Sequence, residues 1–177
     1  MSFDIKPLIR TIPDYPHKGI MFRDVTTLFG DANGMREVVQ QLAELYKNQE
    51  FDLIAGIDAR GFIIGGALAI EMGKGFIPIR KKGKLPADVI SEEYDLEYGS
   101  AIIEIHEDAL KKGQKILLLD DLLATGGTAL AGIKLIRRLG GIVEHAAFIV
   151  DLPELGGSKR LADDGIIVSA LCAFDGA

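Results

Sequence analysis

The segment Lys115-Ile-Leu-Leu-Leu-Asp-Asp-Leu-Leu-Ala-Thr-Gly-Gly-Thr128 decides how the rest of this sequence is interpreted. Its aliphatic run, residues 116–119, stops at two adjacent carboxylates, Asp120 and Asp121, and a turn of small residues follows. An uninterrupted aliphatic run that ends at a polar turn is typical of a strand buried on both faces, as in a parallel sheet. A helical pattern then covers residues 129–139. Because ligands of open α/β sheets bind beyond the carboxyl ends of such strands, we expect a binding site here.

The chemistry of this turn suits a phosphorylated sugar. Gly126 and Gly127 allow the backbone to approach a phosphate closely, and the amides at the start of a helix are unpaired and lie at the positive end of the helix dipole. Thr125 and Thr128 add hydroxyl donors. The two carboxylates would repel a phosphate in the same pocket, but one phosphate's length away they suit the vicinal hydroxyls of a ribose. The alternative is a buried strand that ends in an Asp-rich loop without a ligand.

Length and composition predict one soluble α/β domain over residues 1–177. The chain has 48% hydrophobic and 26% charged residues, and no repeat or linker divides it. The net charge of −6 argues against nucleic-acid or membrane partners, so any anion site must be local. The single cysteine, Cys172, has apolar neighbours and is expected to be a buried structural thiol. Without a signal-peptide core or a long apolar stretch, we expect a cytoplasmic protein.

Hydrophobic periodicity predicts the other elements. Helices are expected over residues 3–11, 34–48, 62–72 and 155–162, and strands over residues 52–57, 75–80, 100–106, 142–150 and 166–171. Strands that alternate with helices indicate a mostly parallel central sheet flanked by helices. His17, His106 and His145 show no metal-ligand spacing and are interpreted as structural residues.

Basic residues follow two of the predicted strands. Arg60, in the turn Asp58-Ala-Arg-Gly61, is poorly placed for the helix dipole but well placed to bind an anion. The cationic run Arg80-Lys-Lys-Gly-Lys84 opens a segment with little periodicity that continues to Gly99. Segments of this kind are commonly mobile lids, and a basic lid could close over a pyrophosphate. A solvated charged surface is the alternative.

Near the N-terminus, residues 15–25 are predicted to form an extended loop that leads into a short strand. Phe22 could stack on a flat heterocycle while backbone amides and carbonyls bind the edge of the ring. From the residues alone the alternative is favoured, in which Phe22 pins the loop to the core and Arg23 pairs with Asp24.

The sequence resembles the type I phosphoribosyltransferases, and among them the adenine-specific family, over nearly its whole length. Five motifs in the family's order carry the resemblance: Lys18-Gly-Ile-Met-Phe-Arg-Asp24, Asp58-Ala-Arg-Gly-Phe62, Arg80-Lys-Lys-Gly-Lys-Leu-Pro86, Leu96-Glu-Tyr-Gly99 and Asp120-Asp-Leu-Leu-Ala-Thr-Gly-Gly-Thr128. The resemblance implies a small N-terminal, base-binding hood (residues 1–33), a core (residues 34–177) and a flexible lid loop (about residues 81–99). It also implies a homodimer.

The implied reaction transfers ribose 5-phosphate from phosphoribosyl diphosphate (PRPP) to adenine and gives AMP and pyrophosphate. In this family Asp120 and Asp121 would hold the ribose hydroxyls, and the 5-phosphate would lie among Ala124, Thr125, Gly126, Gly127 and Thr128. The pyrophosphate would meet Arg60, Arg80, Lys81 and Lys84. The cofactor Mg²⁺ would be held mainly by PRPP, without a direct protein ligand.

The resemblance also assigns the base. Phe22 would stack on adenine, with the backbone around Met21 binding its edge and Arg23 close by, which reverses the interpretation from the residues alone. Glu97 and Arg60 would be catalytic, with Glu97 handling the purine proton as N9 attacks, and Tyr98 would bind substrate. Similar enzymes that act on 6-oxopurines carry an aspartate at the position of Ala124, so this residue favours adenine.

Two alternatives to the adenine-specific enzyme stay open at this point. One is a phosphoribosyltransferase for another purine base, such as hypoxanthine, guanine or xanthine. The other is a non-catalytic regulator that binds PRPP as a signal. Such regulators usually add a DNA-binding module or a basic surface, and this acidic chain has no spare residues for either.

Overall fold

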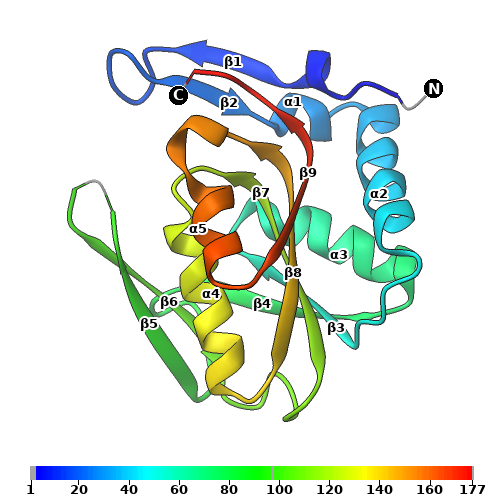
Figure 1. Ribbon diagram of the computed structural model, residues 1–177, viewed down its shortest axis with the longest axis vertical. Coiled ribbons are helices and arrows are strands. Elements are labelled where there is room, and N and C mark those ends of the chain that lie inside the picture. Colours follow the sequence, from blue (N-terminus) through cyan, green and yellow to red (C-terminus); the bar gives the residue numbers. More distant parts are fainter. Residues whose placement is uncertain (1–2, 97, 177) are drawn as a thin grey trace.

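The computed structural model describes residues 3–96 and 98–176 of the chain and shows a twisted central sheet covered by helices (Figure 1). The strands of this sheet are β3 (Leu53–Ile57), β4 (Gly75–Lys81), β5 (Val89–Asp95), β6 (Ser100–His106), β7 (Lys115–Leu123), β8 (Ile142–Asp151) and β9 (Ile167–Ala173). Their spatial order is β5-β6-β4-β3-β7-β8-β9. The five strands from β4 to β9 in that order are parallel, whereas β6 is antiparallel to both of its neighbours. The predicted mostly parallel sheet is confirmed.

Helices cover both faces of the sheet and divide its core in two. On one face lie α2 (Ala32–Tyr46) and α3 (Arg60–Met72), and on the other lie α4 (Gly127–Arg138) and α5 (Gly157–Asp163). Strand β7 serves both cores, because Leu117 and Leu119 pack on the side of α2 and α3 while Leu118 packs on the side of α4. All three leucines are fully buried, as expected for a strand between two helical layers.

The helices begin and end close to the predicted residues. Helix α2 starts at an Asp31 cap, whose side chain accepts a hydrogen bond from the Gly34 amide at 2.7 Å, and it buries Val38, Leu42 and Tyr46 on one stripe. Helix α4 ends just before Gly140, which has φ of 87°. No helix in the described ranges is long and apolar enough to cross a membrane.

Strand β7 is longer than its aliphatic run predicts. It continues through Asp120 and Asp121 to Leu123, because its pairing with β8 continues to the Leu123–Asp151 pair. The two carboxylates therefore belong to the last part of a central strand and not to a loop beyond it. This places their backbone in a rigid element.

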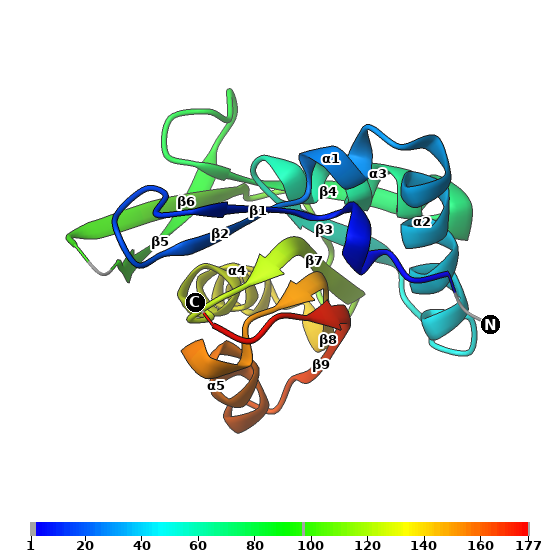
Figure 2. The same ribbon diagram turned by 90° about the horizontal axis from the view of Figure 1, so that it is seen from above.

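The predicted helix over residues 3–11 is wrong. Only a 3₁₀ turn forms at Lys6–Leu8, and the chain then enters β1 (Arg10–Pro13), which pairs antiparallel with β2 (Met21–Asp24). The β-branched residues 11 and 12 suit this two-stranded ribbon better than a helix. With the short α1 (Thr26–Phe29), the ribbon lies over the carboxyl edge of the main sheet (Figures 1 and 2), and these elements are called the hood below.

The segment predicted as a lid loop is partly a strand. Residues 89–95 form β5, which pairs with β6 in continuous register from Val89–His106 to Asp95–Ser100, and residues 82–88 connect β4 to it without helix or strand. Salt bridges attach β5 to α4, because Arg138 and Lys134 both pair with the Glu92 carboxylate, at 3.2 and 3.8 Å. The regular pairing of this hairpin therefore extends to Asp95 and Ser100.

Cys172 lies half-buried on β9. Its thiol donates a hydrogen bond to the carbonyl oxygen of Ile149 at 3.4 Å, and burial raises the pKa of the thiol to about 11. At neutral pH this sulfur is protonated and therefore a poor nucleophile, in line with the expected structural thiol.

Candidate active site

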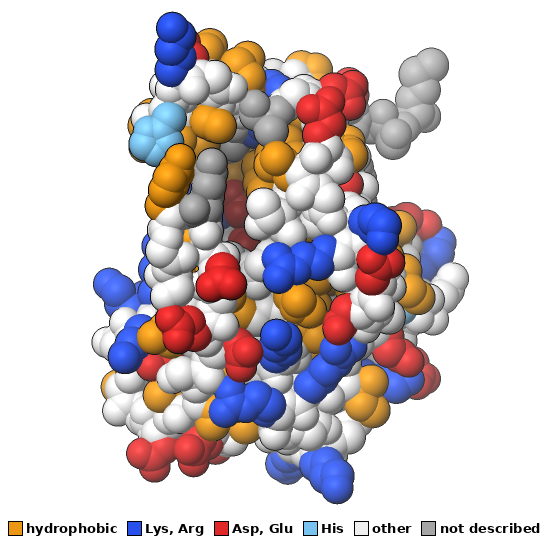
Figure 3. All heavy atoms as spheres, turned by 60° about the vertical axis from the view of Figure 1, so that its left-hand side comes forward, with side chains coloured by type: hydrophobic (Ala, Val, Ile, Leu, Met, Phe, Trp, Pro, Cys, Tyr) orange, Lys and Arg blue, Asp and Glu red, His pale blue; other side chains and the backbone are white. Residues whose placement is uncertain are grey.

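Three segments with predicted site residues meet at the carboxyl edge of the sheet. Strand β3 lies between β4 and β7, with Ile57 beside Ile79 and Gly56 beside Leu119. The turn after β3, the end of β4 and the end of β7 are consequently neighbours, although they are far apart in the sequence. Figure 3 shows a hollow on the surface between the hood and the core, with acidic atoms visible inside it. This is the place where open α/β sheets bind ligands.

The turn between β7 and α4 forms a small cavity. It has a volume of about 90 Å³ and is lined by Asp120, residues 122–129 and Phe148. Gly126 has φ of 82°, a conformation that disfavours a side chain, and α4 begins at the next residue. Gly126 carries no side chain that could cap the helix, so the first amides of α4 remain available to an anion. The predicted phosphate site thus has the backbone that its chemistry requires.

A second segment that the sequence analysis missed supports this turn from behind. The Gly157 amide, at the start of α5, donates a hydrogen bond to the Ala124 carbonyl oxygen at 3.0 Å. A Cβ at Gly157 would collide with that oxygen and lie 3.0 Å from the Gly126 nitrogen. Glycine is therefore required here for close contact between two backbones. Only a glycine pair beyond a predicted strand signals this contact in the sequence, and such pairs are common.

The two carboxylates of β7 differ in their surroundings. The Asp120 side chain accepts a hydrogen bond from the Asp121 amide at 2.9 Å, and the Asp121 side chain is buried and paired with an arginine. Burial raises the pKa of Asp120 well above its usual range, and the charge of Asp121 adds to the effect. A Cβ at Gly61 would lie 3.1 Å from an Asp120 carboxylate oxygen, so this glycine lets α3 approach the acid pair closely. The pair is thereby held in a crowded, poorly solvated place.

Arg60 links the β3 turn to the acid pair. Its Nε donates a hydrogen bond to Asp121 Oδ2 at 2.5 Å, while about half of its side chain stays exposed. Burial lowers the pKa of Arg60, but the hydrogen bond and the charges of Asp121 and Asp120 outweigh that effect and raise it. The guanidinium is therefore charged, and its exposed nitrogens can still meet an anion.

The basic residues at the end of β4 lie on the same side. Arg80 pairs with Asp58 at 3.4 Å, donates a hydrogen bond to the Lys84 carbonyl oxygen at 3.3 Å and lies 5.6 Å from the centre of the Phe62 ring. The peptide bond between Asp58 and Ala59 is cis. Lys81 and Lys84 are exposed, and neither has an ion-pair partner among residues 3–96 and 98–176. Arg60 and Arg80 are thus held at this edge by Asp121 and Asp58, whereas the roles of Lys81 and Lys84 at the pyrophosphate remain predictions.

Phe22, the residue predicted to stack on the base, lies on strand β2 of the hood. Met21 and Phe22 lie on β2 and are partly exposed, and Phe22 contacts Tyr15 edge to face, with ring centres 5.2 Å apart. Arg23 does not pair with Asp24, so that interpretation from the residues alone is wrong. Arg23 donates hydrogen bonds to Thr11 Oγ1 and to C-terminal carbonyl oxygens at 2.7–3.2 Å. It thereby fastens the hood to the C-terminal segment.

Asp24 has other partners. It accepts hydrogen bonds from the Thr26 hydroxyl at 2.6 Å and the Thr26 amide at 2.9 Å, and it forms a salt bridge with Arg10. The Thr26 hydroxyl and the Arg10 guanidinium together lower the pKa of Asp24 to about 2. This buried carboxylate stabilises the turn from β2 into α1.

The end of strand β5 lies next to the turn between β7 and α4. An ideal Cβ on Gly127 would be 3.6 Å from both the Asp95 carbonyl oxygen and the Tyr94 ring, so the hairpin approaches the start of α4 just before its tip. Glu97, the predicted catalytic residue, lies outside the described residues. Tyr98 is 80% exposed. The roles of both residues remain predictions.

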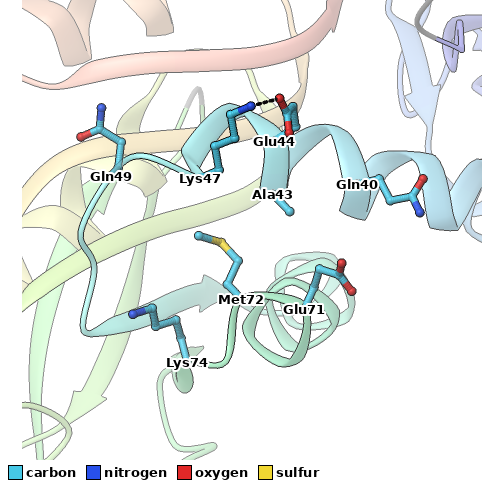
Figure 4. A pocket seen from close by; sticks show the side chains of 8 residues that line it. All are labelled: Gln40, Ala43, Glu44, Lys47, Gln49, Glu71, Met72 and Lys74. Carbon is cyan, nitrogen blue, oxygen red and sulfur yellow. Dashed lines mark hydrogen bonds and ion pairs between the residues drawn. The ribbon is translucent and has the colours of Figure 1, made fainter.

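A pocket of about 560 Å³ lies elsewhere, between the last turns of α2 and α3 (Figure 4). Its lining is a mixture of charged and polar side chains, among them Lys74 and Gln49, which precede β4 and β3. It therefore opens at the amino edge of the sheet, opposite the residues described above. Its Lys47 is paired with Glu44 within the pocket wall. Nothing in this pocket matches the predicted site.

Comparison with known proteins agrees with this geometry. The family model of the phosphoribosyl transferase domain matches residues 29–172. Adenine phosphoribosyltransferases from Ruegeria pomeroyi and Cereibacter sphaeroides are 59% and 60% identical over 172 residues, which is 97% of this chain and 96–97% of theirs.

Solved structures show the same relationship. The crystal structure of adenine phosphoribosyltransferase from Thermoanaerobacter pseudethanolicus is 48% identical, with a TM-score of 0.92 over 96% of this chain and 98% of that one. The enzyme from Giardia lamblia, solved with 9-deazaadenine, is 34% identical, with a TM-score of 0.91 over 97% and 96%. The chain therefore belongs to the type I phosphoribosyltransferases, in the adenine phosphoribosyltransferase family.

Proposed function

We propose that the protein is an adenine phosphoribosyltransferase that transfers ribose 5-phosphate from PRPP to adenine and releases AMP and pyrophosphate. The observation that carries the proposal is the arrangement at the end of β7, where the partly buried Asp120 and the buried Asp121 lie a few residues before a glycine turn with free helix amides. Full-length similarity to adenine phosphoribosyltransferases supports the choice of base.

The donor would lie along the carboxyl edge of the sheet. Amides and hydroxyls of residues 124–128 would bind the 5-phosphate, and Asp120 and Asp121 would accept hydrogen bonds from the ribose hydroxyls. The pyrophosphate would then lie toward Arg60 and Arg80, the cations that the β3 turn and the end of β4 bring to this edge. One extended molecule would thus meet all three segments.

The base would lie below the hood. Phe22 on β2 offers a partly exposed aromatic ring, and backbone near Met21 could hydrogen-bond the edge of adenine. Ala124 supports adenine because it leaves no acid at the position used for 6-oxopurines. The similar Giardia enzyme, whose structure was solved with 9-deazaadenine, is consistent with this choice.

The chemistry is substitution at the anomeric carbon. As pyrophosphate leaves, that carbon acquires oxocarbenium character and the leaving oxygens gain negative charge, which Arg60 and the β4 cations would stabilise. Asp120 and Asp121 would orient the ribose, so that catalysis is largely positioning. Glu97 would take the proton from the purine as N9 attacks. The β5–β6 hairpin would keep water away from the oxocarbenium-like anomeric carbon.

The residues of the site fit Mg²⁺ that arrives with the substrate. Hard oxygen donors are present in Asp120 and Asp121, but Asp121 is already paired with Arg60, and no group of three metal-ligating side chains occurs among the described residues. Such a site would hold the ion mainly through oxygens of PRPP. When bound, Mg²⁺ supplies charge neutralisation at the pyrophosphate.

We also propose a homodimer in the cytoplasm. Helix α3 exposes apolar side chains on its outer face, with Ile70 85% and Ile63 49% exposed, and a second copy of the chain could cover them. Sedimentation of the purified protein tests the dimer, and cell fractionation tests the location.

The decisive test measures AMP formation from purified protein, PRPP and Mg²⁺, with adenine, hypoxanthine, guanine and xanthine offered separately. Product with adenine alone is expected. Product with a 6-oxopurine would refute the base assignment while keeping the donor site. PRPP binding without product from any base would favour the non-catalytic regulator instead.

A further inference from the structure

Arg160 on α5 lies beside the turn that is proposed to bind the 5-phosphate. Its Nη1 atom is 3.5 Å from the position that a Cβ on Gly127 would occupy. A side chain at position 127, the first residue of α4, would therefore contact this guanidinium. No motif in the sequence connects Arg160 with the turn, because the two are separated by α4 and β8.

Hydrogen bonds on both sides of α5 fix the backbone position of Arg160. Helix α5 is joined to the turn by the hydrogen bond from the Gly157 amide to the Ala124 carbonyl oxygen. On its other side, the Ser158 hydroxyl donates a hydrogen bond to Asp151 Oδ2 at 2.6 Å, which ties α5 to the end of β8. Arg160 follows within the same short helix, and its amide donates a hydrogen bond to the Gly156 carbonyl oxygen at 3.0 Å. A shift of the turn would therefore displace the backbone of Arg160, and a shift of α5 would displace the turn.

The charge of Arg160 is uncompensated within the described part of the chain, where no carboxylate forms an ion pair with it. Cations near it do have such partners. Lys159 pairs with Asp163 at 2.6 Å, and Arg137 pairs with Asp164 at 2.5 Å. Arg160 is also exposed, so its long side chain can reorient toward a ligand.

The space beside Arg160 is partly enclosed. The Tyr94 ring and the Asp95 carbonyl oxygen, both from the β5–β6 hairpin, approach the same Gly127 position at 3.6 Å. A cation that is partly shielded from water interacts more strongly with an anion than one on an open surface. A carbonyl oxygen alone does not neutralise it, whereas an anion bound by the turn would.

We propose that Arg160 binds the 5-phosphate of PRPP from the side of α5, in addition to the amides and hydroxyls of residues 124–128. This inference rests on the proposed function and adds a residue outside the five motifs to the donor site. A guanidinium suits the role because it can donate two parallel hydrogen bonds to phosphate oxygens. Gly127 then has a second purpose, which is to leave the path from Arg160 to the phosphate open.

The test compares Arg160→Met with the matched control Lys159→Met, which removes a neighbouring cation whose partner is Asp163. Calorimetry would measure the Kd of ribose 5-phosphate and of pyrophosphate, and kinetics would measure the KM of PRPP and of adenine. We expect Arg160→Met to weaken ribose 5-phosphate and to raise the KM of PRPP roughly tenfold or more. Pyrophosphate affinity and the KM of adenine should change less than about twofold, and Arg160→Lys should restore part of the loss.

Three outcomes would overturn the assignment. The first is unchanged affinity of Arg160→Met for ribose 5-phosphate. The second is equal weakening of ribose 5-phosphate and pyrophosphate, which would indicate a general electrostatic effect. The third is an equal loss in Lys159→Met. Failure of the proposed function is distinguishable, because then the unmodified protein itself would form no AMP.

Discussion

Arg60 and Asp121 join the pyrophosphate side of the site to its ribose side. Their side chains are separated by 61 positions in the sequence, yet Nε of Arg60 lies 2.5 Å from Oδ2 of Asp121. They meet because β3 and β7 are adjacent parallel strands that end at the same edge. One guanidinium can therefore neutralise a buried carboxylate and still present nitrogens to the substrate.

Arg60→Gln is expected to reduce stability as well as activity. It leaves the Asp121 carboxylate, which is 5% exposed, without its cation, and such a loss costs roughly 1–3 kcal/mol of unfolding free energy. Urea denaturation would measure the cost. The double variant Arg60→Gln/Asp121→Asn should recover most of the stability but not the activity. If the double variant were as unstable as the sum of the single variants, the pair would not be coupled.

Asp120→Asn is expected to stabilise the ligand-free protein while weakening PRPP binding. Because burial and Asp121 raise the pKa of Asp120 in the folded state, ionisation at neutral pH opposes folding. The sign follows directly: the stability associated with this group is full at low pH and is lost as the pH rises through the raised pKa. An asparagine keeps the acceptor for the Asp121 amide without the charge. A rise in Tm of roughly 2–4 °C, measured at pH 7 and shrinking toward pH 4, would correspond to about 1 kcal/mol in a domain of this size. A lower Tm at pH 7 would contradict this account.

Asp24→Asn is expected to destabilise the hood. The pH dependence is opposite to that of Asp120, because the Asp24 carboxylate stabilises the fold when it is ionised. The Thr26 hydroxyl and Arg10 lower the pKa of Asp24 to about 2, so its stabilising effect is present above the unfolded-state pKa and is lost as the pH falls toward 2. We expect a loss of roughly 1–2 kcal/mol at pH 7, since Arg10 is half exposed and partly screened. Urea denaturation of both proteins at pH 7 and pH 3 would test it. A difference that does not narrow at pH 3 would argue against the carboxylate as the cause.

Gly157→Ala is expected to disturb the phosphate turn without touching a substrate. The added methyl group would collide with the Ala124 carbonyl oxygen, so α5 or the turn must shift. We expect the KM of PRPP to rise roughly tenfold, because misplacement by about 1 Å is costly in a positioned site. The matched control is Gly66→Ala in α3, where a Cβ meets nothing within 4 Å, and this change should be neutral or stabilising by about 0.5–1 kcal/mol. Normal kinetics in Gly157→Ala would show that the turn tolerates movement of α5.

Glu97→Gln is expected to lower kcat by roughly 10²-fold or more, with a small effect on the KM of PRPP. The glutamine keeps the size of the side chain but cannot accept the purine proton. Steady-state kinetics with adenine and PRPP, together with the pH profile of kcat, would test the role. An unchanged kcat would exclude Glu97 as the proton acceptor.

Sequence patterns predicted the parts of the molecule whose structure is local. Strand β3 and helices α2, α3 and α4 were expected within a few residues of their bounds, because aliphatic runs and 3.6-residue periodicity reflect the same burial that forms them. In the hood, the short strand within residues 15–25 was predicted, but the first part of the chain was not. Its residues 3–11 have a helix-like apolar spacing, but pairing between β1 and β2 overrides that preference, and such pairing is not visible in local sequence.

For the site, the sequence by itself determined the chemistry, namely two carboxylates, a glycine turn with hydroxyls and a set of cations, because these depend on residue types and short spacings. Tertiary structure alone decided which of these groups act together. In the structure Arg60 pairs with Asp121, and Arg23 hydrogen-bonds the C-terminal segment and not the neighbouring Asp24. Gly157 and Arg160 lie beside the phosphate turn. The physical reason is that these contacts join different strands and helices, and their geometry depends on the order of strands in the sheet, which no short stretch of sequence encodes.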